Sequence, residues 1–80
     1  MNSPFMIAQS EQLLKATAPH PFGQARVKLF YQKILQRSPE TEELVDALKY
    51  INAVPAGQRE QAFVELAQVL FLSNEFRFVD

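Results

Sequence analysis

The most regular pattern of apolar positions in the chain lies between Glu60 and Phe76. Placed on a helix, its apolar residues recur at spacings of three and four and form one continuous face. The face consists of Phe63, Leu66, Ala67, Leu70 and Phe71, is widened by Ala62, Val64 and Val69, and leaves Gln61, Glu65 and Gln68 as a polar strip. A helix that is apolar over more than half its circumference needs neighbours on several sides. The pattern therefore predicts the central helix of a small bundle.

The same periodicity, with breaks at proline and glycine, predicts three further helices. The expected helices span about residues 4–17, 24–37, 42–53 and 58–73. In the first, Met6, Ile7, Ser10, Leu13, Leu14 and Thr17 share one face; in the second, Val27, Phe30, Tyr31, Ile34 and Leu35; in the third, Leu44, Val45, Leu48 and Ile51. The fold class is all-α, a small four-helix bundle with a short aromatic C-terminal tail. Antiparallel and more orthogonal packing both remain open.

Local signals place several helix ends. Ser3 precedes Pro4, a pair typical of a helix start, and Thr41 is the predicted N-cap of the third helix. Ser73-Asn74 is expected to end the central helix. On the third helix, Asp46 and Tyr50 are expected to point away from the apolar face.

The C-terminal tail carries the candidates for partner contact. Phe76, Arg77 and Phe78 alternate, which suggests an extended segment with both phenylalanines on one side. We expect this tail to return across the bundle and pack against helix one. The alternative is that the aromatic side chains dock on a neighbouring domain or a partner chain.

Composition limits the function classes. Eighty residues allow one domain, 1–80, and the formal net charge of −1 removes the simplest basis for nucleic-acid or membrane-surface binding. The chain has no Cys, which excludes disulfides, thiol chemistry and Cys-type zinc sites. Its apolar runs are far shorter than the roughly 20 residues that span a bilayer, so we do not expect a transmembrane protein. Because the chain starts on a helix and ends on an apolar segment, we expect a domain excised from the C-terminus of a larger protein.

Three groups of residues are candidates for reactive or binding sites. The single His, His20, lies between two prolines and reads as a surface imidazole. An acidic cluster lacks the loop spacing of a cation site and suits the first turn of a helix; it consists of Glu40, Glu42, Glu43 and Asp46. Arg26, Lys33 and Arg37 read as a solvated helix face rather than a phosphate-binding stripe. The sequence thus predicts no catalytic, cofactor-binding or metal-ligating residues.

Three segments together resemble a known family. They are Asn2–Phe5 with Gln9, Leu29–Pro39 leading to Glu42–Leu44, and Ser73–Asp80. In this order they resemble the C-terminal end of a mainly planctomycete family, the domain of unknown function number fifteen fifty-three, also called planctomycete-specific domain one. A weaker likeness is to helical linker modules such as phycobilisome linkers.

The resemblance implies a helical tail of a large extracytoplasmic protein that often carries a cytochrome-c-like domain. No haem motif is possible here without Cys. The family usually has Gly where Gln36 stands, Pro where Ser38 stands and Tyr where Phe78 stands, so the turn after helix two can differ. We expect a non-catalytic structural or interaction module whose partners are preceding domains of the same protein or another protein. The alternatives are an enzyme fragment completed by upstream domains and a small nucleic-acid-binding domain.

Overall fold

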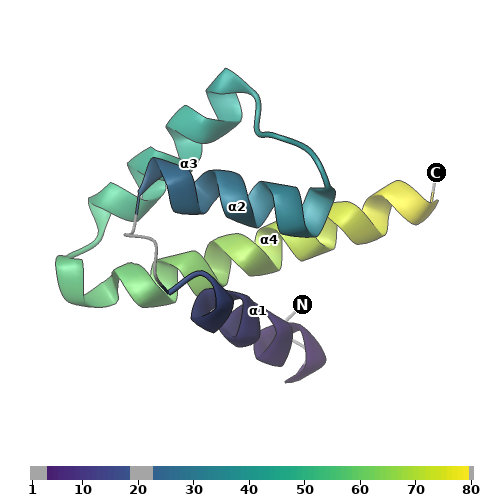
Figure 1. Cartoon of the computed structure of the whole chain (residues 1–80), viewed down its shortest axis with the longest axis horizontal. Helices are drawn as coiled ribbons and strands as arrows, with labels where there is room; N and C mark the ends of the chain where they lie inside the picture. Colours follow the sequence, from purple (N-terminus) through teal and green to yellow (C-terminus); the bar gives the residue numbers. More distant parts are fainter. Residues whose placement is uncertain (1–3, 19–22, 80) are drawn as a thin grey trace.

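The computed structural model describes residues 4–18 and 23–79, and the side chains of those residues through Ser73. Its elements are α1 (Pro4–Ala16), α2 (Gln24–Leu35), α3 (Thr41–Ala53), the short 3₁₀ turn η1 (Ala56–Gln58) and α4 (Arg59–Val79) (Figure 1). The described residues contain these helices and no strand, which confirms the all-α prediction. Most predicted ends agree with the observed ends within two residues.

The long helix α4 is the central element, as its sequence pattern predicts. It packs against α1, α2, α3 and η1, and in Figure 1 it runs between α1 on one side and α2 with α3 on the other. Phe63 is fully buried, and its ring meets that of Phe30 edge-on, with centroids 5.2 Å apart. Val69 differs from the prediction, because it is 53% exposed and lies outside the apolar face.

The buried face of helix α1 includes two small polar residues. Ser10 and Thr17 are buried on the same face as Met6 and Leu14, and α1 packs mainly against α4. The Ser10 hydroxyl donates to the Met6 carbonyl (2.8 Å), so this buried polar group is satisfied within its own helix. Ser10 and Thr17 thus lie on the buried face to which the sequence pattern assigned them.

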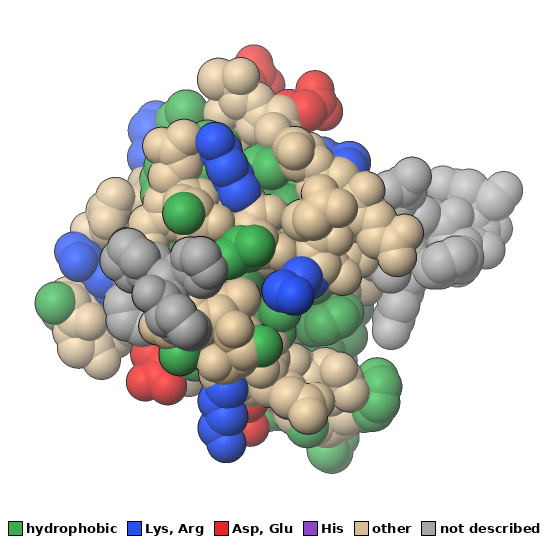
Figure 2. Space-filling model, in the orientation of Figure 1, with side chains coloured by type: hydrophobic (Ala, Val, Ile, Leu, Met, Phe, Trp, Pro, Cys, Tyr) green, Lys and Arg blue, Asp and Glu red, His purple; other side chains and the backbone are tan. Residues whose placement is uncertain are grey.

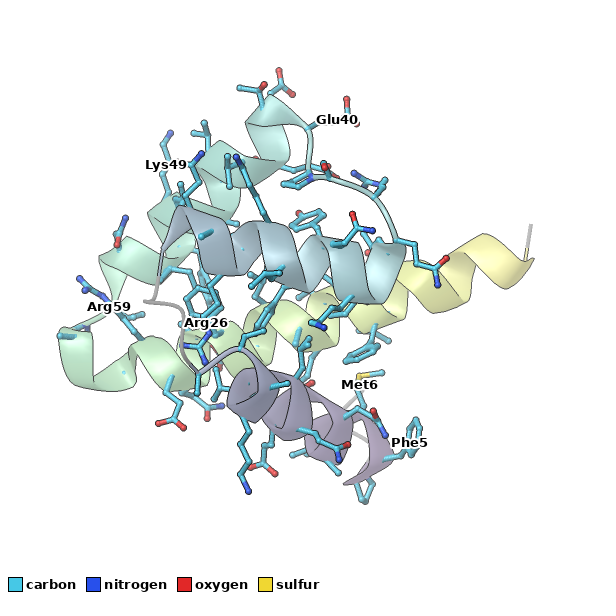
Figure 3. All side chains as sticks on the ribbon, viewed as in Figure 1. Phe5, Met6, Arg26, Glu40, Lys49 and Arg59 are labelled. Carbon is cyan, nitrogen blue, oxygen red and sulfur yellow. The ribbon has the colours of Figure 1, made fainter. Side chains whose placement is uncertain are left out.

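Arg26 on α2 is buried, which corrects its assignment to a solvated face. The side chain is only 4% exposed, and Figure 3 shows it pointing from α2 toward the C-terminal end of α1. Its Nε–H donates to Thr17 Oγ1 (2.9 Å) and its Nη2 donates to the Leu14 carbonyl (2.6 Å). The guanidinium carbon also lies 5.6 Å from the centroid of the Phe63 ring. Arg26 therefore connects α1, α2 and α4.

Helix α2 ends two residues earlier than expected. It stops at Leu35 because Gln36 adopts a left-handed conformation (φ 58°, ψ 34°) at the C-cap. Glycine is the usual residue in this conformation, since a side chain is disfavoured there. Arg37 consequently lies in the connection to α3 rather than in the last turn of α2.

Helix α3 begins one residue before the expected position and buries a different set of residues. Glu40, not Thr41, is its N-cap. The Glu40 backbone N–H donates to Glu43 Oε1 (2.9 Å), a contact of the capping-box type. Ala47 and Ile51 are buried, whereas Val45, which was expected on this face, is 45% exposed.

The prediction of an extended tail is wrong. Helix α4 continues without a break to Val79, and its C-terminal end extends beyond α2 in Figure 1. The reason is that no Gly or Pro occurs from Arg59 onward. The Ser73 hydroxyl donates to the Val69 carbonyl four residues earlier (3.1 Å), as it can within a continuing helix, and does not end it.

The burial pattern of α4 predicts a contrast between two adjacent residues. Leu70 is 4% exposed, so Leu70→Ala should lower the free energy of unfolding by about 2–5 kcal/mol through lost contacts and a residual cavity. The matched change Val69→Ala, at an exposed position, should cost less than about 1 kcal/mol. Urea denaturation followed by circular dichroism measures both. Equal losses would mean that the buried face of α4 is assigned incorrectly.

Candidate functional site

A groove of about 410 Å³ opens where α2, α3 and α4 meet. Its apolar surface comes from Ala47, Leu66 and Val69, its acidic residues are Glu43, Asp46 and Glu65, and two tyrosines, Tyr31 and Tyr50, complete it. We call this depression the α3/α4 groove. Ala47 and Leu66 are nearly buried, whereas Val69 and Tyr50 are 53% and 44% exposed. The groove therefore offers apolar surface to solvent beside negative charge.

One end of the groove is held by an ion pair between the α2–α3 connection and α3. Arg37 donates through Nη1 to Glu43 Oε1 (2.8 Å) and through Nη2 to Glu43 Oε2 (2.9 Å). The guanidinium carbon also lies 5.6 Å from the centroid of the Tyr31 ring. The hydrogen bonds from Arg37, and next that from the Glu40 backbone, lower the pKa of Glu43 to about 2. Glu43 thus stays ionised and fixes the start of α3 against the end of α2.

A second polar contact crosses the groove between α3 and α4. The Tyr50 hydroxyl donates to Glu65 Oε1. This hydrogen bond to a carboxylate, with a smaller contribution from burial, raises the pKa of Tyr50. A raised pKa keeps the phenol neutral, which is the reverse of what an activated nucleophile or base requires. The contact is suited to holding two helices together.

Tyr31 presents its hydroxyl to the groove, while most of its ring is buried in the core. The residue is 6% exposed and lines the groove. Burial, and next the charge of Glu43, raise the pKa of its phenol. No hydrogen bond joins the hydroxyl to any residue in the part of the chain that the structure describes. A hydroxyl in such a position is a ready partner for a polar group that enters the groove.

The acidic cluster predicted from the sequence separates into residues with different surroundings. Glu43 caps α3 and pairs with Arg37, Asp46 lines the groove, and Glu42 is exposed in the first turn of α3. Within residues 4–18 and 23–79, no group of three or more acidic or imidazole side chains is arranged to hold a metal ion. The placement agrees with the helix-dipole interpretation of the first turn.

The predicted cationic stripe does not form. Arg26 is buried among α1, α2 and α4, and Arg37 is engaged by Glu43. Lys33 alone of the three is exposed without such a partner among the described residues. On the face shown in Figure 2, the Lys and Arg side chains lie apart from one another rather than in one patch.

Two other groups of sequence candidates lie outside the described parts. His20 falls in the 19–22 connection, and the side chains of Phe76, Arg77 and Phe78 follow the last described side chain, Ser73. Partner contact by these three residues stays a prediction. The groove itself was missed as a site, although one signal was present: Asp46 and Tyr50 lie one turn apart on the polar side of α3.

Comparisons with family models, curated proteins and solved structures found no match. Among the helices described, none is both long and apolar enough to cross a membrane. The structure thus describes a small helical bundle with an apolar groove flanked by carboxylates.

The Arg37–Glu43 pair predicts how stability depends on pH. The pKa of Glu43 is about 2 in the folded chain, against an ordinary value of 4.5. Its contribution is thus fully present above about pH 4.5 and is lost as the pH falls toward about 2. The melting temperature of the wild type should exceed that of Glu43→Gln at pH 6, and the difference should shrink as the pH falls through this window. A difference that stays constant down to pH 2 would show that the carboxylate is not stabilised by Arg37.

Proposed function

We propose that the chain is a non-catalytic interaction module that binds a partner protein, or a neighbouring domain of its own protein, through the α3/α4 groove. The observation that carries this proposal is the exposed apolar surface of Val69 and the Tyr50 ring within a groove whose walls are helices. Exposed apolar surface beside polar groups is typical of protein-binding sites.

The polar groups of the groove favour binding over catalysis. Glu43 is engaged by Arg37, and Glu65 accepts a hydrogen bond from Tyr50. Both contacts join structural elements: the Glu43 carboxylate is held by Arg37, and the Tyr50 phenol is kept neutral. An enzyme fragment completed by upstream domains has no specific observation in its favour.

The placement of the basic residues argues against a nucleic-acid-binding domain. Phosphate binding needs several accessible cations on one surface. Arg26 is buried and Arg37 is paired with Glu43, while the groove carries three carboxylates. These charges would repel a phosphate backbone at the α3/α4 groove.

The planctomycete resemblance supports the same class of function. It suggests a helical module appended to a larger extracytoplasmic protein, with partners among the preceding domains or in another protein. The aromatic segment Phe76–Phe78 is a second candidate contact, since α4 carries it beyond the end of α2.

Site-specific photo-crosslinking tests the proposal. A benzoylphenylalanine residue replaces Val69 in the groove, and a matched variant carries it at Lys28, an exposed position on α2 that does not line the groove. In the cells that produce the protein, irradiation should give a discrete protein adduct from position 69 and none from position 28. An intramolecular crosslink to another domain of the same protein would also support the proposal.

Two results would contradict it. One is the absence of any protein adduct from position 69 when the variant is folded by circular dichroism. The other is an equal set of adducts from both positions, which would indicate non-specific collision.

A further inference from the structure

The carboxylates of the groove are only partly neutralised by the residues around them. This remaining negative charge indicates a cationic occupant. Of its carboxylates, Glu43 already binds Arg37 and Glu65 accepts one hydrogen bond from Tyr50. Asp46 has no hydrogen-bond or ion-pair partner among the residues described, and a carboxylate offers several acceptor positions. The groove therefore retains negative charge and acceptor capacity next to its apolar surface.

A second observation, independent of the acidic residues, is the Tyr31 hydroxyl. Tyr31 is 94% buried, as its 6% exposure shows, and it lines the groove without a hydrogen-bond partner within the described part of the chain. The ring is buried, whereas the hydroxyl opens into the groove and keeps its capacity to donate and accept a hydrogen bond. An N–H donor that enters the groove would satisfy its oxygen.

The chain itself shows how such a cation can bind. At one end of the groove the Arg37 guanidinium faces the Tyr31 ring and donates two hydrogen bonds to Glu43. At the other end Tyr50 and Asp46 lie one turn apart on α3, a spacing at which side chains are neighbours. Tyr50 is 44% exposed, so part of its ring is open to a cation. A planar guanidinium suits this combination of ring and carboxylate better than an ammonium does.

The apolar part of the groove indicates that the cation is accompanied by an aliphatic side chain. Val69 is 53% exposed, beside the nearly buried Leu66 and Ala47. The volume of about 410 Å³ lies within the range of about 300–1,000 Å³ that is usual for binding pockets. An arginine with an aliphatic neighbour would cover both parts, which an isolated cation would not.

Building on the proposed function, we propose that the α3/α4 groove binds an arginine-containing amphipathic segment of a protein partner. The arginine lies against Asp46, Glu65 and Tyr50 and donates to the Tyr31 hydroxyl. An adjacent aliphatic side chain covers Val69. Charge complementarity thus selects the partner, and the apolar surface positions it.

The test is an NMR titration of the full ¹⁵N-labelled chain with the peptide acetyl-Leu-Arg-Leu-Arg-Leu-amide. Amide shifts should concentrate on the residues of α3 and α4 that line the groove. The same peptide with citrulline in place of both arginines keeps the shape and loses the charge, and it should bind at least tenfold more weakly. The double variant Asp46→Asn/Glu65→Gln should also reduce binding at least tenfold.

A matched control removes the same charge elsewhere. Glu11→Gln/Glu42→Gln changes two exposed carboxylates that do not line the groove, and it should bind within about twofold of the wild type. Val69→Ser tests the apolar contribution without altering charge and should weaken binding as well. Circular dichroism melts of all variants identify any that fail to fold; if the double variant does, Asp46→Asn alone supplies the charge comparison.

The proposal is overturned if the peptide causes no shifts at about 1 mM, if citrulline binds equally well, or if the control and groove variants weaken binding alike. If position 69 gives a protein adduct and any of these results is also obtained, the proposed interaction function stands and the proposed basic partner is rejected. An adduct between two copies of this chain would reject a separate partner. Absence of the adduct would reject the interaction function itself.

Discussion

The buried guanidinium of Arg26 is the contact on which the arrangement of the helices depends. It caps the Leu14 carbonyl near the C-terminal end of α1, holds the Thr17 hydroxyl, and lies near the Phe63 ring of α4. Burial lowers the pKa of Arg26, and Glu60 partly offsets this effect; an arginine remains charged nonetheless. A buried charge tolerates little displacement of its partners, because losing them would leave it unpaired. Arg26 therefore constrains how α1 and α2 lie on α4.

This constraint reaches the groove through α2. The helix that carries Arg26 at its start also carries Tyr31, and the connection after it carries Arg37. Arg37 then binds Glu43, which holds the first turn of α3. On the opposite side Tyr50 joins α3 to Glu65 on α4. The groove is thus formed by contacts between its own helices, and this preorganisation would reduce the ordering cost of the proposed binding.

The fold could be predicted because local signals dominate it. Proline and glycine mark the connections, and the spacing of Phe63, Leu66 and Leu70 identifies α4 as the central helix. The burial of Arg26 was not predicted, because the sequence pattern placed this residue on a solvated face. On a helical projection it lies at the border of the apolar face, in line with Lys33 and Arg37 but also four residues before Phe30. Its decisive partners, Thr17 and Leu14, belong to another helix.

The groove escaped prediction for a related reason. Its residues come from three helices, and periodicity within one helix says nothing about which faces of different helices meet. Asp46 and Tyr50 were correctly expected on the polar side of α3. Val69 was assigned to the buried face because its type is apolar, whereas the structure leaves it 53% exposed beside Tyr50. An exposed apolar residue such as Val69 indicates a groove only once the position of the neighbouring helix is known.

The most direct test of this account is the NMR signal of the Arg26 side chain in the ligand-free protein. If the guanidinium joins the three helices, its Nε–H should exchange slowly with water and show nuclear Overhauser contacts to the Phe63 ring and to Thr17. The Nε–H of Arg37, whose side chain is 38% exposed, should exchange much faster. An Arg26 signal that exchanges as rapidly as that of Arg37 and lacks contacts to Phe63 would contradict the central role of this residue.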